Sequence, residues 1–262
     1  MLHFTPLDHP EPPPFERVDG APESGVLVVC DHASPVIPGR YGELGLSGDE
    51  RLAHIAWDIG AALVSKGLAR RLGCPAVLAG ISRLVIDCNR QPGDPCSIPT
   101  VSGGIPVPGN AAVDDPEADA RAESWFWPYH HEIGTQLAHL FRHRGVPAMV
   151  SVHSFTPCLG AEPRPWHVGV LSNRDRRMAE PLLAALAMRG ELVVGDNQPY
   201  SGREINYTLD THAGAAGLPH ISFEIRQDLL ADEAACEHWA ELLALVLNPV
   251  LADEALRQAI VY

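Results

Sequence analysis

The stretch Val26-Leu-Val-Val-Cys-Asp-His-Ala-Ser34 decides which fold we expect for this chain. It begins with an apolar run whose length and composition are typical of a strand buried on both faces of a parallel sheet. The run ends on Asp31 and His32 and then turns toward Pro35. Ligands of open α/β sheets bind where such strands end, so these two polar residues are the first candidates for a functional site.

Two later segments follow the same plan. Residues 148–154 form a strand pattern that ends on His153, and residues 220–226 form another that carries Glu224. Because the carboxyl ends of parallel strands meet at one edge of a sheet, we expect His32, His153 and Glu224 to lie close together there. The sequence therefore predicts that these strand ends hold a metal ion.

Strand patterns alternate with helix patterns along the chain, without a repeat of roughly 20 to 50 residues. Further strands are expected at residues 74–79, 82–90, 167–171 and 192–194. Helices are expected at residues 47–72 and at residues 115–143, the latter with an interruption at Pro128. Two more helices are expected, one that ends at Arg189 and one that begins at about Asp232. This order predicts the α/β class with three layers, in which an open and mostly parallel sheet lies between two layers of helices.

The expected domain organisation is simple. Residues 1–23 are rich in proline and acidic residues, which predicts an irregular N-terminal arm without any regular element. Residues 24–262 are predicted to form a single domain, because a chain of this length can bury one large core. Within it, the stretch 91–110 contains five prolines and several glycines, a composition typical of a long loop that covers or lines a site.

Charge and cysteine content exclude several classes of partner. The formal net charge is -14 and the 19 basic residues are dispersed, which disfavours nucleic acid and acidic membrane surfaces. No segment reaches the roughly 18 continuous apolar residues of a membrane span. The six cysteines form no C-x-x-C pair, which favours reduced thiols, and the first residues do not resemble a signal peptide. We expect a cytoplasmic protein, and its oligomeric state is left open.

Physical chemistry alone supports a zinc site without proving one. Two histidines and one acid are enough for a catalytic zinc ion that keeps a fourth position for water, and His32 and His153 could provide the imidazoles. Asp58 is one candidate acid, because it lies beside the apolar stripe of the first expected helix and, once buried, needs a cation, a metal ion or several hydrogen-bond donors as partner. Glu43 and Glu50 are alternatives. Histidines that make only structural hydrogen bonds are the competing interpretation.

A series of short blocks lies between about residues 24 and 245. The blocks are Val29-Cys-Asp-His-Ala-Ser34, His54-Ile-Ala-Trp-Asp-Ile-Gly60, Ser82-Arg-Leu-Val-Ile-Asp-Cys-Asn-Arg90, Ile105-Pro-Val-Pro-Gly-Asn110, Pro128-Tyr-His130, His153-Ser-Phe-Thr-Pro157, Arg164-Pro-Trp-His-Val-Gly-Val170, Asp196-Asn-Gln-Pro-Tyr200, Tyr207-Thr208 and Glu224-Ile-Arg-Gln-Asp228. In this order they resemble the N-formylglutamate amidohydrolase family. The resemblance implies a phosphorylase/hydrolase-like α/β fold similar to zinc carboxypeptidases, one catalytic zinc ion, and hydrolysis of an amide on an amino acid.

The resemblance also implies the metal ligands. His32 and His153 fall where related zinc peptidases hold their two zinc histidines at strand ends. The carboxypeptidase-like acid three residues after the first histidine is absent, because Pro35 occupies that position. Asp58 is the expected third ligand instead, since zinc-dependent murein amidases of similar architecture take their acid from the helix after the first strand.

Catalytic and substrate-binding residues are carried over in the same way. Glu224 resembles the general base of carboxypeptidases, and the alternative is an ion pair with Arg226, two residues later on the same face. Asp31 would either orient a ligating histidine or cap the next turn. Arg83 and Arg226 are further catalytic candidates. The candidates for substrate binding are Arg90, Asn110, His130, Thr156, Arg164 and Tyr207, among which the arginines suit a substrate carboxylate.

The substrate that gives the family its name is N-formyl-L-glutamate, which hydrolysis converts to formate and L-glutamate. Deacylation of another N-acyl amino acid or of a cell-wall-type amide is an alternative, because the block Asp31-His-Ala-Ser34 resembles a subgroup distinct from the deformylases of histidine degradation. A third alternative is a binding or regulatory domain that keeps the fold without activity. The expected partner is a small N-acyl amino acid, and the expected cofactor is one zinc ion.

Overall fold

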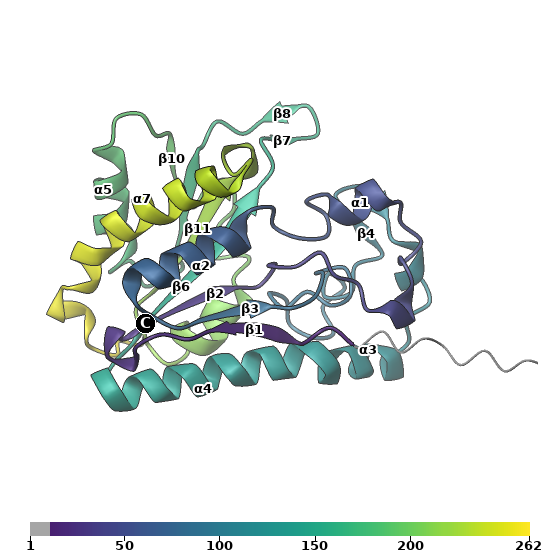
Figure 1. Cartoon of the computed structure of the whole chain (residues 1–262), viewed down its shortest axis with the longest axis horizontal. Helices are drawn as coiled ribbons and strands as arrows, with labels where there is room; N and C mark the ends of the chain where they lie inside the picture. Colours follow the sequence, from purple (N-terminus) through teal and green to yellow (C-terminus); the bar gives the residue numbers. More distant parts are fainter. Residues whose placement is uncertain (1–10) are drawn as a thin grey trace, which may run out of the picture.

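The computed structural model describes residues 11–262, which are arranged around a seven-stranded sheet (Figure 1). The strands are β1 (Phe15–Val18), β2 (Val26–Cys30), β3 (Ala76–Ala79), β6 (Ala148–Phe155), β9 (Val168–Leu171), β10 (Val194–Asp196) and β11 (His220–Arg226), in the spatial order β1-β3-β2-β6-β11-β9-β10. The four strands β3, β2, β6 and β11 run parallel, whereas β1 and β9 are antiparallel to β3 and β11. The predicted open and mostly parallel α/β sheet is confirmed.

Helices cover both faces of this sheet (Figure 1). They are α1 (Gly48–Leu52), α2 (Ala61–Leu72), α3 (Asp115–Arg121), α4 (Trp127–Arg144), α5 (Ala179–Ala187), α6 (Tyr207–Leu209) and α7 (Glu233–Leu251). The helices α2, α5 and α7 pack on one face and α4 packs on the other. Both β2 and β3 are buried along their whole length, which explains why their sequences are continuous apolar runs.

A separate group of apolar side chains holds the connecting segments together at one end of the sheet. The group includes Leu44, Ile55, Leu84, Val107, Trp125 and Phe126. Two short antiparallel ladders also belong to the connections, β4 (Val101–Ser102) with β5 (Ile105–Pro106) and β7 (Cys158–Leu159) with β8 (Glu162–Pro163). These segments therefore have a small core of their own, which fixes them relative to the strand ends.

The expected helix 47–72 is wrong as a single element. Ser47 caps the short helix α1, but the chain then leaves helical geometry until α2 starts after Gly60. Gly60 has a φ of 82°, a left-handed conformation that L side chains rarely adopt. Asp58 therefore lies in the connection between the two helices, where its backbone N–H donates to the carbonyl of His32 at 2.9 Å.

The expected edge strand at residues 82–90 is also wrong, because these residues form successive turns and are almost all buried. The hydroxyl of Ser82 accepts a hydrogen bond from the N–H of Leu84 at 3.2 Å. In the same way, the carboxylate of Asp87 accepts from the N–H of Asn89 at 2.8 Å. Such local bonds from side chain to backbone compete with strand pairing, which accounts for the difference.

The N-terminal segment also departs from its prediction. The prediction of an irregular arm over residues 1–23 is wrong at Phe15–Val18, which form the strand β1. This strand pairs with β3 in an antiparallel register that places Phe15 opposite Ala79. One paired side is enough for a strand at the edge of a sheet, even next to prolines. Residues 1–10, which the prediction also covers, lie outside the described part of the chain.

The interruption expected in the helix 115–143 falls close to Pro128. Residues 122–126 form a π-helical segment between α3 and α4. Pro128 lies in the first turn of α4, just after this segment, and its missing N–H interrupts the regular α-helical hydrogen bonding there. The other predicted helices and strands agree with the structure to within a few residues. None of the helices within residues 11–262 is long and apolar enough to cross a membrane.

Gly60→Ala should lower the free energy of unfolding by about 3 kcal/mol, since a left-handed backbone and overpacking both oppose the added methyl group. The new Cβ would lie 2.5 Å from the Cβ of Leu230. Urea denaturation measures the change. Gly39→Ala is the matched control, because nothing lies within 4 Å of the Cβ that it adds. Equal losses in the two variants would contradict this explanation of Gly60.

Candidate active site

Three neighbouring strands bring the predicted residues together at one end of the sheet. His153 lies in β6, and Glu224 is its register partner in β11. His32 lies just beyond the end of β2, which pairs with β6 on the other side. Because all three strands are parallel, their carboxyl ends point the same way. The structure confirms that the three strand ends meet.

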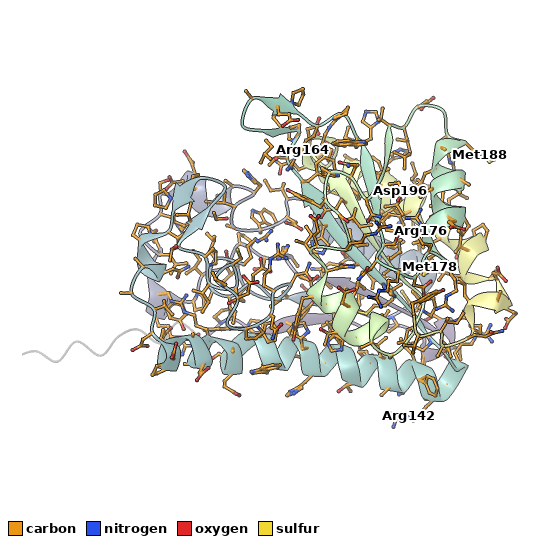
Figure 2. All side chains as sticks on the ribbon, turned by 180° about the vertical axis from the view of Figure 1, so that it is seen from behind. Arg142, Arg164, Arg176, Met178, Met188 and Asp196 are labelled. Atoms are coloured by element: carbon orange, nitrogen blue, oxygen red, sulfur yellow. The ribbon has the colours of Figure 1, made fainter. Side chains whose placement is uncertain are left out.

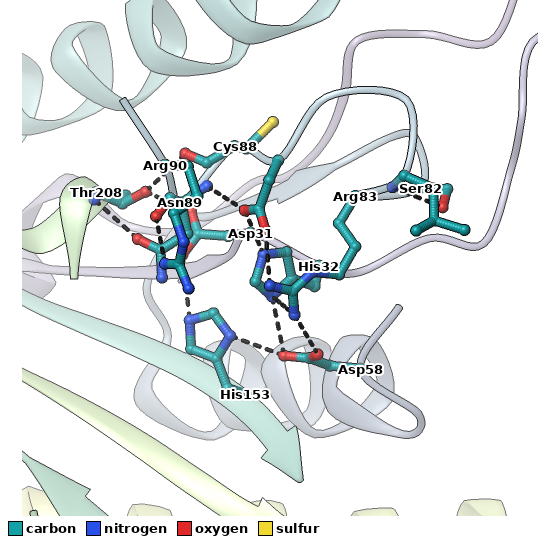
Figure 3. A network of polar contacts seen from close by, with 12 residues as sticks. Asp31, His32, Asp58, Ser82, Arg83, Cys88, Asn89, Arg90, His153 and Thr208 are labelled. Atoms are coloured by element: carbon teal, nitrogen blue, oxygen red, sulfur yellow. Dashed lines mark hydrogen bonds and ion pairs between the residues drawn. The ribbon is translucent and has the colours of Figure 1, made fainter. Parts of the chain in front are cut away.

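His32, Asp58 and His153 form the centre of the site (Figure 3). Oδ2 of Asp58 lies 2.8 Å from Nδ1 of His153 and 3.3 Å from Nδ1 of His32. All three side chains are buried, and one ligand atom from each lies within 4.8 Å of the others, so the group could hold a metal ion. Asp58 reaches this position from the connection between α1 and α2 rather than from a helix.

A second carboxylate lies behind each histidine. Nε2 of His32 is 2.7 Å from Oδ1 of Asp87. Nε2 of His153 is 3.2 Å from Oδ2 of Asp31, an ion-pair distance without hydrogen-bond alignment. Carboxylates in this position keep the proton on the outer ring nitrogen, because they attract its N–H, and thereby fix the tautomer of a ligating histidine. Both Nδ1 atoms are then left to face Asp58.

The charges of this cluster require a cation between its members. With their protons on Nε2, both histidines direct Nδ1 lone pairs at the carboxylate of Asp58, which is repulsive unless a proton or a metal ion lies between them. Burial opposes a charged imidazole, but the adjacent carboxylates of Asp31 and Asp58 raise the pKa of His153 well above its usual value. Two imidazole nitrogens and one carboxylate oxygen are also a zinc donor set, so these residues fit zinc.

Arg83 provides a fixed positive charge next to the cluster (Figure 3). Its Nη2 donates to Oδ2 of Asp87 at 2.7 Å, and its Nη1 lies 3.8 Å from Oδ1 of Asp58. Burial alone would raise the pKa of Asp87, but Arg83 and His32 hold that pKa well below its usual range. Asp87 therefore stays ionised and fixes Arg83 and His32 at once.

Glu224 is the acid with the most unusual protonation behaviour in the site. Burial raises the pKa of its carboxyl to about 7, against the lowering effect of the charged His153. Its Oε2 has no hydrogen-bond partner among the described residues. The competing partner suggested by the sequence, Arg226, donates instead to Asp228 at 2.8 Å. A carboxyl with such a pKa can accept and return a proton near neutral pH.

A cavity of about 140 Å³ opens beside the cluster. Its wall includes the predicted residues His32, Asp58, Arg83, Arg90, His153, Thr156 and Glu224. Phe155, Leu171 and Ile205 give the same wall an apolar part. The cavity thus combines cationic groups, an acid–base group and a short apolar surface, which suits a small anionic molecule.

Arg164, another predicted residue, lies directly behind this wall. Its Nη1 donates to Oγ1 of Thr156 at 3.3 Å and to Oη of Tyr200 at 3.1 Å, and both of these residues line the cavity. Arg164 itself is buried. Within residues 11–262, the hydrogen bonds of this guanidinium go to neutral hydroxyl groups, so its positive charge has no close counter-ion in the described structure.

The structure does not bring Asn110 and Arg226 to the cavity wall. Nδ2 of Asn110 donates to the carbonyls of Leu84 and Pro99 at 2.8 and 2.9 Å, so this amide ties two connecting segments together. Arg226 is drawn away by the carboxylate of Asp228. Strand alternation could not predict either outcome, because both side chains are held by partners from loops.

His130 and Tyr207 also lie away from the cavity wall. Nε2 of His130 is 2.9 Å from the carbonyl of Cys88, and its Nδ1 is 2.9 Å from Nε2 of His212. Burial lowers the pKa of His130 to about 4, which keeps its ring neutral. The ring of Tyr207 packs against Phe126 and His130. These two residues hold α4 and α6 together instead of facing the cavity.

Several residues of the wall were not among the predicted site residues. Among them are His54, Asn89, Tyr200 and Asn206. His54, Asn89 and Tyr200 lie within the blocks that resemble the amidohydrolase family. A block of sequence does not show which of its polar side chains points into the cavity, so these three could not be singled out. Asn206 directly precedes the block Tyr207-Thr208, and no pattern distinguished it.

The fold and the site together define a class of protein. An open α/β sheet whose strand ends gather two histidines, an aspartate and a buried glutamate is a framework for a hydrolase with a site that could hold a metal ion. A sequence model of the N-formylglutamate amidohydrolase family matches residues 24–231. The chain belongs to this family, and its activity is accordingly that of an amidohydrolase.

Several solved structures are similar to this chain, two of them over more than nine-tenths of its length. The crystal structure of a gene product from Agrobacterium tumefaciens is 34% identical with a TM-score of 0.86, over 91% of this chain and 94% of that one. An N-formylglutamate amidohydrolase from Ralstonia eutropha JMP134 is 19% identical with a TM-score of 0.64, over 94% of this chain and 99% of that one, a likeness that shows the fold. No match was found among curated proteins.

Asp87→Asn should destabilise the protein by about 3 kcal/mol, because it leaves the half-buried Arg83 and the buried His32 without their carboxylate. The folded-state pKa of Asp87 is lowered, so the difference from the wild type should be full above about pH 4, the ordinary aspartate pKa, and shrink as the pH falls further. Denaturation curves at several pH values measure this difference. A difference that did not change with pH would contradict the charge balance.

The control for this variant is Asp196→Asn, which removes a pair with Arg176 at the surface (Figure 2). Because Asp196 is largely exposed, its ion pair is screened by water, and the variant should change stability by less than about 1 kcal/mol.

Proposed function

We propose that this chain is a zinc-dependent amidohydrolase that cleaves the amide of a small N-acyl amino acid. N-formyl-L-glutamate, which would yield formate and L-glutamate, is the first candidate substrate. One observation carries the proposal: Nδ1 of His32, Nδ1 of His153 and Oδ2 of Asp58 converge beside Glu224 in one cavity. Membership of the N-formylglutamate amidohydrolase family supports the substrate class.

His32, Asp58 and His153 would hold the zinc ion. When bound, zinc supplies a Lewis acid that polarises an acyl carbonyl and lowers the pKa of water. Burial would raise the pKa of Asp58, but His32 and His153 keep that pKa well below its usual range, so this ligand is ionised. Asp31 and Asp87 hold the outer nitrogens of the two rings, which keeps both Nδ1 atoms available to a metal.

Glu224 would move the proton of the reaction. With a pKa of about 7, a large share of this carboxyl is ionised at neutral pH and can take a proton from the attacking water. Once protonated, it can return that proton to the nitrogen that leaves as the amide C–N bond breaks. Its burial beside the cluster supports this double role, since a fully solvated glutamate would be a weaker base.

Arg83 would stabilise the negative charge that develops on the acyl oxygen. Its guanidinium lines the cavity next to the cluster and is already fixed by Asp87, so little reorganisation is needed during the reaction. The remaining cationic groups would bind the carboxylates of the amino acid. Arg90 lies in the cavity wall, and Arg164 reaches it through Thr156 and Tyr200. Two separate cationic positions favour a substrate with two carboxylates.

Glu224→Gln should retain zinc and lose about 10²- to 10⁴-fold in kcat, because an amide cannot accept the proton. Metal analysis and steady-state kinetics on the same preparation measure both properties. His153→Ala should instead lose stoichiometric zinc. Glu162→Gln, on the exposed strand β8, is the matched control and should behave as the wild type. A zinc-loaded Glu224→Gln variant with full activity would refute the assigned role.

A panel of N-formyl, N-acetyl and longer N-acyl amino acids tests the substrate. The zinc-loaded wild type should prefer N-formyl-L-glutamate, and chelation of the metal should abolish the reaction. Arg164→Gln should raise KM for this dicarboxylate by roughly 10-fold, because it removes the positive charge behind Thr156 and Tyr200, and affect N-formyl-alanine less. Arg142→Gln, on the outer side of α4, is the control (Figure 2). If none of these N-acyl amino acids were hydrolysed, the proposed substrate class would be wrong.

A further inference from the structure

The carboxylate behind His153 is itself held by two hydroxyl groups. Oδ1 of Asp31 accepts hydrogen bonds from Oη of Tyr129 at 2.8 Å and from Oγ1 of Thr208 at 2.7 Å. The other oxygen, Oδ2, lies 3.2 Å from Nε2 of His153. The side chains of Asp31, Tyr129 and Thr208 are buried, so water does not compete for these bonds. Neither hydroxyl group belongs to the wall of the active-site cavity.

This arrangement restricts the orientation of Asp31. A carboxylate can rotate about its last bond and exchange its two oxygens unless its partners distinguish them. Here both hydroxyl groups point at Oδ1, which leaves Oδ2 as the oxygen for His153. A fixed carboxylate oxygen beside Nε2 favours the proton on that nitrogen and directs Nδ1 toward Asp58.

The two hydroxyl groups come from separate elements, and each is placed by an irregular helix. Tyr129 lies in the first turn of α4, directly after the π-helical residues 122–126. Thr208 lies in α6, which continues into the π-helical residues 210–214. The backbone N–H of Thr208 also donates to Oδ1 of Asn89 at 3.1 Å, which fixes this turn. Single π-helical turns often occur where a side chain needs a position that a regular helix does not give.

The histidine on the other side of the cluster has a different support. Asp87, behind His32, is held by the charged guanidinium of Arg83 at 2.7 Å and by the backbone N–H of Asn89 at 2.8 Å. Asp31 has only neutral hydroxyl groups on its far oxygen. Removal of these hydroxyl groups should therefore act on His153 and leave the support of His32 in place.

We propose that Tyr129 and Thr208 are positioning residues, whose hydroxyl groups fix Asp31 so that it holds His153 with Nδ1 turned toward Asp58. Neither residue touches the reacting atoms. The inference rests on the proposed function, because its consequence for the reaction is the affinity of the His32, Asp58 and His153 group for zinc. It adds two residues from α4 and α6 to the parts of the chain on which the site depends.

Tyr129→Phe and Thr208→Val, alone and combined, test the proposal. Each single variant should weaken zinc binding about tenfold and the double variant more, as is typical when a group that orients a metal ligand is removed. Chelator competition measures the dissociation constant. Thr208→Ser, which keeps the hydroxyl group, should restore wild-type affinity. Thr135→Val is the matched control, because its hydroxyl bonds only the carbonyl of His131 within α4, at 2.9 Å.

A second measurement on the metal-free protein separates this inference from the proposed function. The Nε2 proton of His153 should be visible by NMR in the wild type and exchange faster with water in the double variant, while the Nε2 proton of His32 is unchanged. Folded variants with wild-type zinc affinity and unchanged proton exchange would overturn the proposal. If the wild type bound no zinc, the proposed function would fail, but the proton-exchange result would still decide the role of Tyr129 and Thr208.

Discussion

The active site depends on one balance of charge inside the protein. Four carboxylates, those of Asp31, Asp58, Asp87 and Glu224, are buried close together, and the cationic groups in closest contact with them are two imidazoles and the guanidinium of Arg83. The network therefore stays ionised only if protons or a cation occupy the space between the histidines and Asp58. Burial, with the negative charge of Asp58, raises the pKa of Glu224 to about 7 and so keeps this carboxyl partly protonated. The tendency to bind a metal ion and the raised pKa of Glu224 thus both follow from the burial of several carboxylates in a small space.

The sheet provides the geometry on which this balance relies. His153 and Glu224 are opposite each other on adjacent parallel strands, so their separation is set by backbone pairing rather than by flexible loops. Loops contribute the remaining groups, and these are fixed by a core of their own and by hydrogen bonds between loop and strand, such as the bond from the backbone of Asp58 to His32. Rigid strands therefore hold the metal and proton chemistry, while the loops supply the charges that surround it.

The sequence predicts those parts of the structure in which burial leaves few choices of residue. The strand that leads to His32 is an example, since a strand covered on both faces must be apolar. Asp58 could be named as a candidate ligand but not placed, because the break between α1 and α2, which ends at the left-handed Gly60, does not change the periodicity of the sequence. The turns at residues 82–90 and the outward course of Arg226 depend on local hydrogen bonds, from Asn89 to Asp87 and from Arg226 to Asp228. Such bonds between a side chain and its close neighbours leave no periodic signal.

The N-terminal strand has a consequence that is independent of catalysis. β3 is buried along its whole length, and β1 pairs with it on its outer side. Without β1, the free N–H and C=O groups of this apolar strand would form a template on which a second chain could add a strand. β1 is the edge strand instead, and it is partly exposed and carries charged side chains. One of them, Glu16, forms an ion pair with Lys66 at 2.8 Å. The segment before the first buried strand thus protects the sheet from edge-to-edge aggregation.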